Sequence, residues 1–175
     1  MMKNIFTKTK YSFKNGFSLV ETLVAITILV LAITGPLTVA YQSLSNSKNI
    51  KNQTTAIFLA QDAMEFMKNL RDSNALAGNA WLITIGTCST ECTVDTTDGS
   101  ISTPPCGSSC PVLKFDSATG LYGHDPSWVD TRFRRTVMVE SISGNEALIT
   151  VNITWGSGVQ AKSLIVTDNI FDWHE

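Results

Sequence analysis

One stretch limits what this chain can fold into: the twenty residues from Thr22 to Tyr41 contain no charged side chain. A helix rises about 1.5 Å per residue, so twenty apolar residues cross a hydrocarbon core of roughly 30 Å. Glu21 directly precedes this run. An acid within a membrane helix costs about 2.5–3.5 kcal/mol at the bilayer centre on insertion scales, and such acids usually have a functional partner. The run therefore predicts a membrane-spanning helix in which Glu21 needs an explanation.

The residues before the apolar run carry positive charge only. The lysines of residues 1–16 are Lys3, Lys8, Lys10 and Lys14, and no acid lies among them. Basic residues that flank a membrane helix stay on the cytoplasmic side. We therefore expect a single-pass protein of the plasma (inner) membrane, with a cytoplasmic N-terminus and an extracytoplasmic globular domain.

The N-terminal segment resembles the signature of the type IV prepilins and pseudopilins. The matching residues are a short basic leader ending in Lys14-Asn15-Gly16, then Phe17, then Glu21 four residues later, and then the hydrophobic helix. The resemblance implies that prepilin peptidase cuts between Gly16 and Phe17 and N-methylates Phe17. It also implies that Glu21 pairs with the terminal amine of a neighbouring subunit during filament assembly. An amine and a carboxylate that neutralise each other avoid the cost of burying either one alone.

Two simpler interpretations of the N-terminus were weighed against this one. A secretory signal peptide has roughly 7–15 apolar residues and a small-residue cleavage site, and Thr38-Val39-Ala40 loosely resembles such a site. The apolar run is longer than that, and Glu21 interrupts its start. A plain single-pass anchor has no use for Glu21. The prepilin-type interpretation is preferred because it gives this carboxylate a role.

Gly35 and Pro36 lie inside the apolar run. Proline removes a backbone donor and clashes with the preceding turn, so we expect a kink or local melting of the helix there. Many pilins carry a helix-breaking proline in this region, and the resemblance implies the same geometry.

Beyond Tyr41 the chain becomes polar and then amphipathic. Apolar residues recur at spacings of three and four, which predicts one helical stripe: Ile57, Ala60, Met64, Met67 and either Leu70 or Arg71. We expect the helix to end near residues 72–74 and its stripe to pack on the protein's own sheet, although a groove for a partner is the alternative.

From residue 80 onward the pattern favours β structure. Residues 112–115 and 121–122 flank a predicted hairpin turn, and Trp81 to Ile85 is apolar but of uncertain type. Strands are expected at residues 133–142, 147–155 and 161–167, because apolar and polar residues alternate along the second and turn signals separate all three. These strands predict a three-stranded antiparallel meander whose apolar face the helical stripe covers.

The expected fold class is therefore α+β: a long N-terminal helix packed on a small antiparallel sheet, as in pilins. The expected organisation is a cleaved leader (residues 1–16), a transmembrane and assembly helix (17–41), an amphipathic exported helix (42–73) and a disulfide-stapled, β-rich globular domain (74–175).

The four cysteines occur as Cys88-x-x-x-Cys92 and Cys106-x-x-x-Cys110. Structural zinc sites use shorter spacings, and an even number of cysteines in an exported domain favours disulfides. Three connectivities are possible. We prefer the nested one, Cys88–Cys110 with Cys92–Cys106, while two local five-residue loops remain feasible.

Other candidate sites carry weaker signals. Asp95 to Gly99 holds acids at short spacing that suit calcium, but it lacks the EF-hand pattern and fits a solvated turn better. Arg132, Arg134 and Arg135 suit contacts with DNA phosphates, although surface pairing with acids is the preferred interpretation. The two histidines, His124 and His174, belong to no catalytic motif, and His124 is expected to be exposed.

Charge and composition complete the functional expectation. Without the four lysines of the leader, nine basic residues stand against fifteen acids, so nucleic acid has no general attraction to the chain. We expect a minor pilin or pseudopilin, similar to the PilV-like minor pilins, in a type IV pilus or type II secretion-like filament. Its expected partners are prepilin peptidase, other pilin subunits, the pilus assembly platform and the membrane; no enzyme activity, cofactor or metal is expected. The alternatives are a major structural pilin, or a tip adhesin or DNA-uptake subunit.

Overall fold

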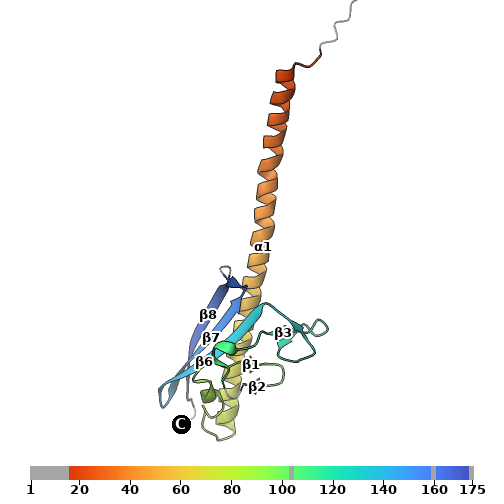
Figure 1. Ribbon diagram of the computed structural model, residues 1–175. Coiled ribbons are helices and arrows are strands. Elements are labelled where there is room, and N and C mark those ends of the chain that lie inside the picture. The colour runs from red at the N-terminus through yellow and green to blue at the C-terminus, as the bar shows by residue number, and fades with distance from the viewer. Residues whose placement is uncertain (1–15, 103–104, 159–160, 174–175) are drawn as a thin grey trace, which may run out of the picture. The chain divides into compact units, whose positions relative to one another are not determined.

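The computed structural model describes residues 16–102, 105–158 and 161–173 (Figure 1). The chain divides into two compact units, Met1–Ser47 and Lys48–Glu175. One long helix, α1 (Leu19–Leu76), begins in the first unit and ends in the second, and every strand belongs to the second. The result is the expected α+β class, a long apolar N-terminal helix with small antiparallel sheets.

Helix α1 is unbroken at the proline. Pro36 lies inside the helix, so the local melting expected at Gly35 and Pro36 is absent. A proline removes one donor from the hydrogen-bond ladder, at a cost of about 3 kcal/mol, while the turns before and after it keep theirs. The hydroxyls of Thr34 and Thr38 also donate to the carbonyls of Val30 and Thr34, at 3.0 and 2.8 Å. These residues therefore do not end or interrupt the helix.

The C-terminal part of α1 carries the helical side of the core. Its buried residues follow one stripe: Ala56, Leu59, Ala60, Ala63, Met64 and Met67. Ile57 is 40% exposed, so the predicted stripe is shifted by one position at its start. The shift favours alanines, whose small side chains let a sheet approach the helix closely. The helix ends two residues beyond the expected range, and Gly78 adopts φ +71° just after it, as is common past a helix C-terminus.

The main sheet is the expected antiparallel meander. Strands β6 (Phe133–Ser143), β7 (Glu146–Trp155) and β8 (Lys162–Phe171) pair in the order β6-β7-β8. Val137 pairs with Val151, which pairs with Val166. Alternate residues of β7, from Ala147 to Trp155, are buried and join the helical stripe in one hydrophobic cluster. The alternation of β7 therefore predicted its buried face correctly.

Short elements fill the segment between α1 and β6. Strands β1 (Val94–Asp95) and β2 (Ser100–Ile101) form a hairpin. Strand β3 (Lys114–Phe115) lies between β4 (Tyr122–Gly123) and β5 (Val129–Asp130), which confirms the hairpin predicted here and adds a third strand. The segment of uncertain type becomes turns that lead into a 3-10 helix, Ile85–Cys88, with Trp81 and Ile85 buried.

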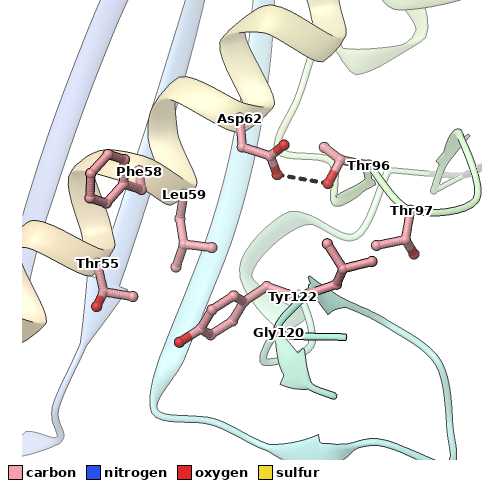
Figure 2. A pocket seen from close by; sticks show the side chains of 9 residues that line it. Thr55, Phe58, Leu59, Asp62, Thr96, Thr97, Gly120 and Tyr122 are labelled. Atoms are coloured by element: carbon pink, nitrogen blue, oxygen red, sulfur yellow. Dashed lines mark hydrogen bonds between the residues drawn. The ribbon is translucent and has the colours of Figure 1, made fainter. Parts of the chain in front are cut away.

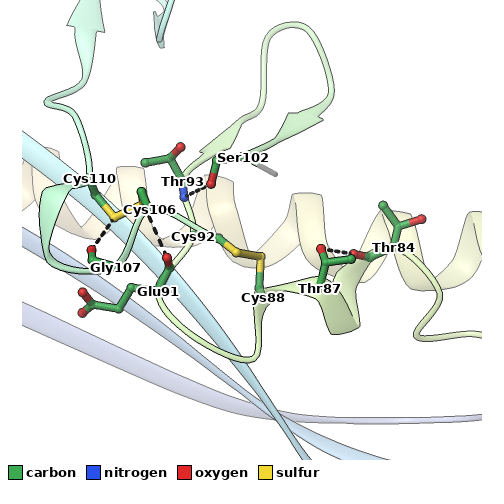
Figure 3. Close-up of a disulfide and its surroundings, with 10 residues drawn as sticks. All are labelled: Thr84, Thr87, Cys88, Glu91, Cys92, Thr93, Ser102, Cys106, Gly107 and Cys110. Carbon is green, nitrogen blue, oxygen red and sulfur yellow. Dashed lines mark hydrogen bonds between the residues drawn. A yellow bond between two sulfur atoms is a disulfide. The ribbon is translucent and has the colours of Figure 1, made fainter. Parts of the chain in front are cut away.

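The four cysteines form two local disulfides, Cys88–Cys92 and Cys106–Cys110 (Figure 3). The preferred nested pairing is therefore wrong. Cys88 is the last residue of the 3-10 helix Ile85–Cys88, and the second bridge encloses the 3-10 helix Gly107–Ser109. The Cα atoms of the two pairs lie 5.4 and 4.9 Å apart, within the range of a disulfide. The two bridges are still neighbours, because the carbonyl of Glu91 accepts a hydrogen bond from the Gly107 amide at 3.0 Å.

Candidate functional site

The start of α1 presents an unpaired acid. Phe17 and Ser18 precede the helix, and Glu21 lies in its first turn, where the amide of Thr22 already donates to the Ser18 carbonyl at 3.1 Å. Among the described residues, Glu21 forms no hydrogen bond or salt bridge. A carboxylate in the first turn is favoured by the partial positive charge of the helix N-terminus. The side chains of Phe17 and Glu21 are both exposed, so each is available to another molecule.

The first unit exposes a continuous apolar surface. Every described residue from Gly16 to Ser47 is exposed, and α1 is long and apolar enough to cross a membrane. Its threonines need no outside partner, because the hydroxyls of Thr27, Thr34 and Thr38 donate to carbonyls of the same helix. Exposed apolar area of this extent is not found on ordinary soluble domains and marks a membrane or protein contact.

Among the described residues, no contact requires glycine at position 16. A Cβ built on Gly16 has no heavy atom within 4 Å. The lysines of the leader, together with Asn15 and His174, lie outside the described residues.

The predicted arginine cluster is not a surface cluster, because Arg135 is fully buried. Its Nη1 donates to Asp62 Oδ2 at 2.8 Å and to the Leu59 carbonyl at 3.2 Å, and its Nη2 donates to the Val94 carbonyl at 2.9 Å. Burial lowers the pKa of Arg135, and the adjacent Asp62 carboxylate opposes that shift. Arg135 thus joins β6, α1 and β1, while Arg132 and Arg134 stay accessible. Sequence reasoning missed Asp62, whose only signal was its place beside the helical stripe.

The acidic turn divides into a buried and an exposed part. Asp95 is buried and accepts hydrogen bonds from the amide and hydroxyl of Thr97 and from the amide of His124. Burial alone would raise the pKa of Asp95, but these hydrogen bonds outweigh it and lower the pKa. Asp98 and Gly99 form the expected exposed turn. Within the described ranges, no three His, Cys, Asp or Glu residues are grouped as a metal site would need.

His124 is half-buried, which corrects the expectation that it is exposed. Its Nε2 is buried and has no hydrogen-bond partner in the described ranges. Burial lowers the pKa of His124, and the charge of Asp95 only partly offsets this effect. The neutral imidazole is therefore the form that this site accommodates.

A pocket of about 510 Å³ lies between α1 and the short strands (Figure 2). Phe58 and Leu59 line its helical side, and Thr96 donates a hydrogen bond to Asp62 at 2.7 Å across it. Tyr122 lies on the opposite side. The pocket combines apolar walls with one carboxylate that Arg135 already engages.

The comparison with known families concerns the N-terminal segment alone. Residues 12–35 match the model of the prokaryotic N-terminal methylation motif. No curated protein and no solved structure matches the chain. The matched residues include Gly16, Phe17, Glu21 and most of the apolar run, so the family signal and the exposed surface of the first unit coincide.

Proposed function

The chain belongs to the type IV prepilin and pseudopilin family, as its N-terminal methylation motif indicates, and we propose that it is a minor pilin or pseudopilin of a type IV pilus or type II secretion-like filament. Membership implies processing by prepilin peptidase and assembly with other pilins in the membrane. One observation carries the proposal furthest. The described part of the first unit is an exposed, mostly apolar helix, and the carboxylate of Glu21 at its start has no partner among the described residues.

Processing is proposed at the bond between Gly16 and Phe17, with methylation of the new N-terminal Phe17. Both residues are exposed and precede α1, so the bond between them lies outside the helix and is accessible to a peptidase. Gly16 is not needed for packing against any described residue. Its role is proposed to lie in recognition by the peptidase.

Glu21 is proposed to guide assembly. Cleavage creates an α-amine on Phe17, four residues from Glu21 in the sequence. In a low-dielectric environment a lone carboxylate is costly, and an amine from a neighbouring subunit removes that cost. The apolar surface around Glu21 would then pack against the helices of other subunits.

The precursor is proposed to span the inner membrane once, with its N-terminus in the cytoplasm. The lysines of the leader support this orientation through the positive-inside rule. The unit that begins at Lys48 would then fold outside the cytoplasm, where disulfides form and persist. Its two disulfides suit that compartment.

Mass spectrometry of the mature N-terminus tests the processing step. The expected terminus is N-methyl-Phe17, and a terminus at Tyr41 would reveal a conventional signal peptide instead. Glu21→Ala tests assembly: the precursor should insert and be processed largely as before, but the subunit should be missing from sheared filaments. The matched control is Thr22→Ala, which removes a neighbouring polar group without touching charge. Normal incorporation of Glu21→Ala would refute the pairing.

A major structural pilin is the second candidate. The two roles differ in abundance, so quantitative mass spectrometry of purified filaments separates them: a minor subunit is present at a small fraction of the main one. A DNA-contacting tip role has less support than the sequence suggested, because Arg135 is engaged inside the domain.

A further inference from the structure

The nine basic residues beyond position 47 divide into two groups. Four of them form salt bridges with aspartates: Lys68, Arg71, Lys114 and Arg135. The other five form no salt bridge within the part of the chain that the structure describes: Lys48, Lys51, Arg132, Arg134 and Lys162. Two members of the second group, Arg132 and Lys162, lie at one end of the sheet, and no acid among the described residues pairs with them.

Three strand ends bring two of these cations together. Phe133 pairs with Trp155, and Trp155 pairs with Lys162, so the start of β6, the end of β7 and the start of β8 meet. Arg132 directly precedes β6. A hollow of about 200 Å³ at this end is lined by Arg132, Lys162, Trp155 and Ser157 and by two amides of α1, Asn49 and Asn52.

The lysines of α1 extend the charge around this hollow. Lys48 precedes Asn52 by four residues, so the two side chains share one face of the helix, and Lys51 is adjacent to Asn52 in the sequence. Arg134 is different. It alternates with the buried Phe133 and Arg135 along β6, so its side chain belongs to the opposite face of the sheet.

No carboxylate is found among the described residues that line the hollow. Three other hollows of the same unit each include at least one aspartate: Asp62 in the first, Asp172 in the second, and Asp95, Asp98 and Asp125 in the third. The acid nearest to Arg132 in the sequence, Asp130, lies 3.8 Å from the ammonium of Lys114. A site with two cations, two amides and a hydroxyl, and no acid, favours an anion.

The donor set suits a phosphate group in particular. A guanidinium offers a planar fork that matches two phosphate oxygens, and a lysine adds a compact positive charge. The amides of Asn49 and Asn52 and the hydroxyl of Ser157 supply neutral donors. Trp155 is only 7% exposed and gives the hollow an apolar wall.

Lys48 lies close to the apolar run in the sequence. It follows Tyr41, the end of that run, by seven residues. Seven residues reach at most about 25 Å even when fully extended, so Lys48 stays within that distance of Tyr41. Basic residues on the exported side also oppose the positive-inside rule, and a specific anionic partner there would account for them.

We propose that the hollow formed by Asn49, Asn52, Arg132, Ser157 and Lys162 binds the phosphate of an anionic phospholipid head group. Lys48 and Lys51 would strengthen the attraction to the anionic surface around that lipid. Such a contact would fix the globular unit against the bilayer before the subunit enters a filament. This inference rests on the proposed membrane anchoring.

The test uses the full processed chain in micelles of a neutral detergent, titrated with dioctanoyl phosphatidylglycerol and followed by NMR. The side-chain amides of Asn49 and Asn52 and the backbone amides of Gly156 and Ser157 should shift in a saturable manner. Phosphatidylcholine with the same chains should bind much more weakly. The double variant Arg132→Gln/Lys162→Gln should weaken binding about 30-fold, since each basic residue at an anionic surface contributes roughly a factor of five.

Arg134→Gln is the matched control, because it removes a positive charge two residues from Arg132, from the face of the sheet opposite to the buried Phe133 and Arg135. It should change the affinity less than about twofold if the hollow, rather than general charge, binds the lipid. The proposal would be overturned if Arg134→Gln lost as much affinity for the lipid as Arg132→Gln/Lys162→Gln does. Equal affinity for phosphatidylglycerol and phosphatidylcholine would overturn it as well.

Two further probes separate the possible sources of phosphate. Inorganic phosphate that binds as tightly as the lipid would make free phosphate the ligand. A DNA duplex that displaces the lipid and depends more strongly on Arg132 and Lys162 would make nucleic acid the ligand. Either result overturns the lipid assignment.

Two measurements keep the test decisive. If the double variant does not fold, Lys162→Gln alone, at the exposed start of an edge strand, takes its place, and an unchanged affinity in it contradicts the proposal. Carbonate extraction of membranes reports the anchor independently. A chain that stays in the membrane but shows no preference for phosphatidylglycerol refutes this inference and leaves the proposed function intact.

Discussion

Arg135 Nη1 on β6 lies 2.8 Å from Asp62 Oδ2 on α1, and these residues are 73 positions apart in the sequence. The guanidinium is fully buried, whereas the carboxylate is about half exposed. The helix and the sheet are therefore held together by a charge that water does not reach. The backbone carbonyls of Leu59 and Val94 accept further hydrogen bonds from the same guanidinium.

Removing Asp62 should destabilise the globular unit strongly. A buried charge that loses its partner costs about 3–5 kcal/mol, and we expect about 2–3 kcal/mol for Asp62→Asn because the carboxylate is half exposed and two carbonyls remain as acceptors. The measurement is chemical denaturation of the full chain in detergent, followed by tryptophan fluorescence. The control Lys68→Met breaks a partly exposed pair with Asp168 and should cost less than about 1 kcal/mol. Equal losses of unfolding free energy in the two variants would show that the burial of Arg135 does not determine the cost of removing its partner.

Mild acid should destabilise the same unit through His124. Its pKa is lowered in the folded state from 6.5, so the unfolded chain binds the proton more readily. The stability that the neutral imidazole contributes is fully present above about pH 6.5 and is lost as the pH falls below it. Asp95 acts in a separate window, since its lowered pKa makes stability fall only as the pH drops below the ordinary aspartate value.

Denaturation at several pH values between 8 and 5 checks the role of His124. The stability of the wild type should fall over this range, and His124→Gln should flatten the dependence. His174→Gln is the control, because it removes the other histidine of the sequence. If the pH dependence of stability disappears in His174→Gln and persists in His124→Gln, its assignment to His124 is wrong.

The sequence was most informative where a pattern repeats locally. The alternation of β7 and the charge-free run before Tyr41 predicted a buried strand face and a long apolar helix, because each depends on neighbouring residues only. The partner of Arg135 depends on contacts across 73 positions, and no local pattern encodes it. His124 was misjudged for the same reason, since its burial comes from the distant Asp95 turn. The buried stripe of the helix is shifted by one position at Ile57 because small alanine side chains pack more closely against the sheet than the larger isoleucine does.

The N-terminal motif could be recognised in the sequence because it is a pattern of neighbouring residues rather than a contact. The roles of Gly16, Phe17 and Glu21 within it stay predictions. The basic hollow was not predictable, because Arg132 and Lys162 meet only through the register of β6, β7 and β8. In the sequence Arg132 is a neighbour of Arg134 and Arg135, whereas the pairing of the strands brings it close to Lys162.

Overpacking the contact between helix and sheet should lower stability as much as losing a charge pair. Ala63 has no exposed area and lies in the hydrophobic cluster. Ala63→Leu adds three carbons to a filled site, and we expect a loss of about 1–3 kcal/mol. Gln61→Leu, an exposed position two residues away, should change stability little. The comparison is made by thermal unfolding, and a tolerant Ala63→Leu would mean that α1 is not closely packed there.

Disulfide connectivity can be read from one digest, because Asp95 and Asp98 lie between the two cysteine pairs. Cleavage at these aspartates without reduction should release two separate peptides. One carries Cys88–Cys92 and the other carries Cys106–Cys110, each with an internal bridge. The nested pairing would instead leave the peptides joined until a reductant is added. Alkylation before reduction is the control for free thiols, and the Cys106→Ser/Cys110→Ser variant should leave only the first bridge. A linked peptide in the unreduced digest would show that the turns at Cys88 and Cys106 do not set the pairing.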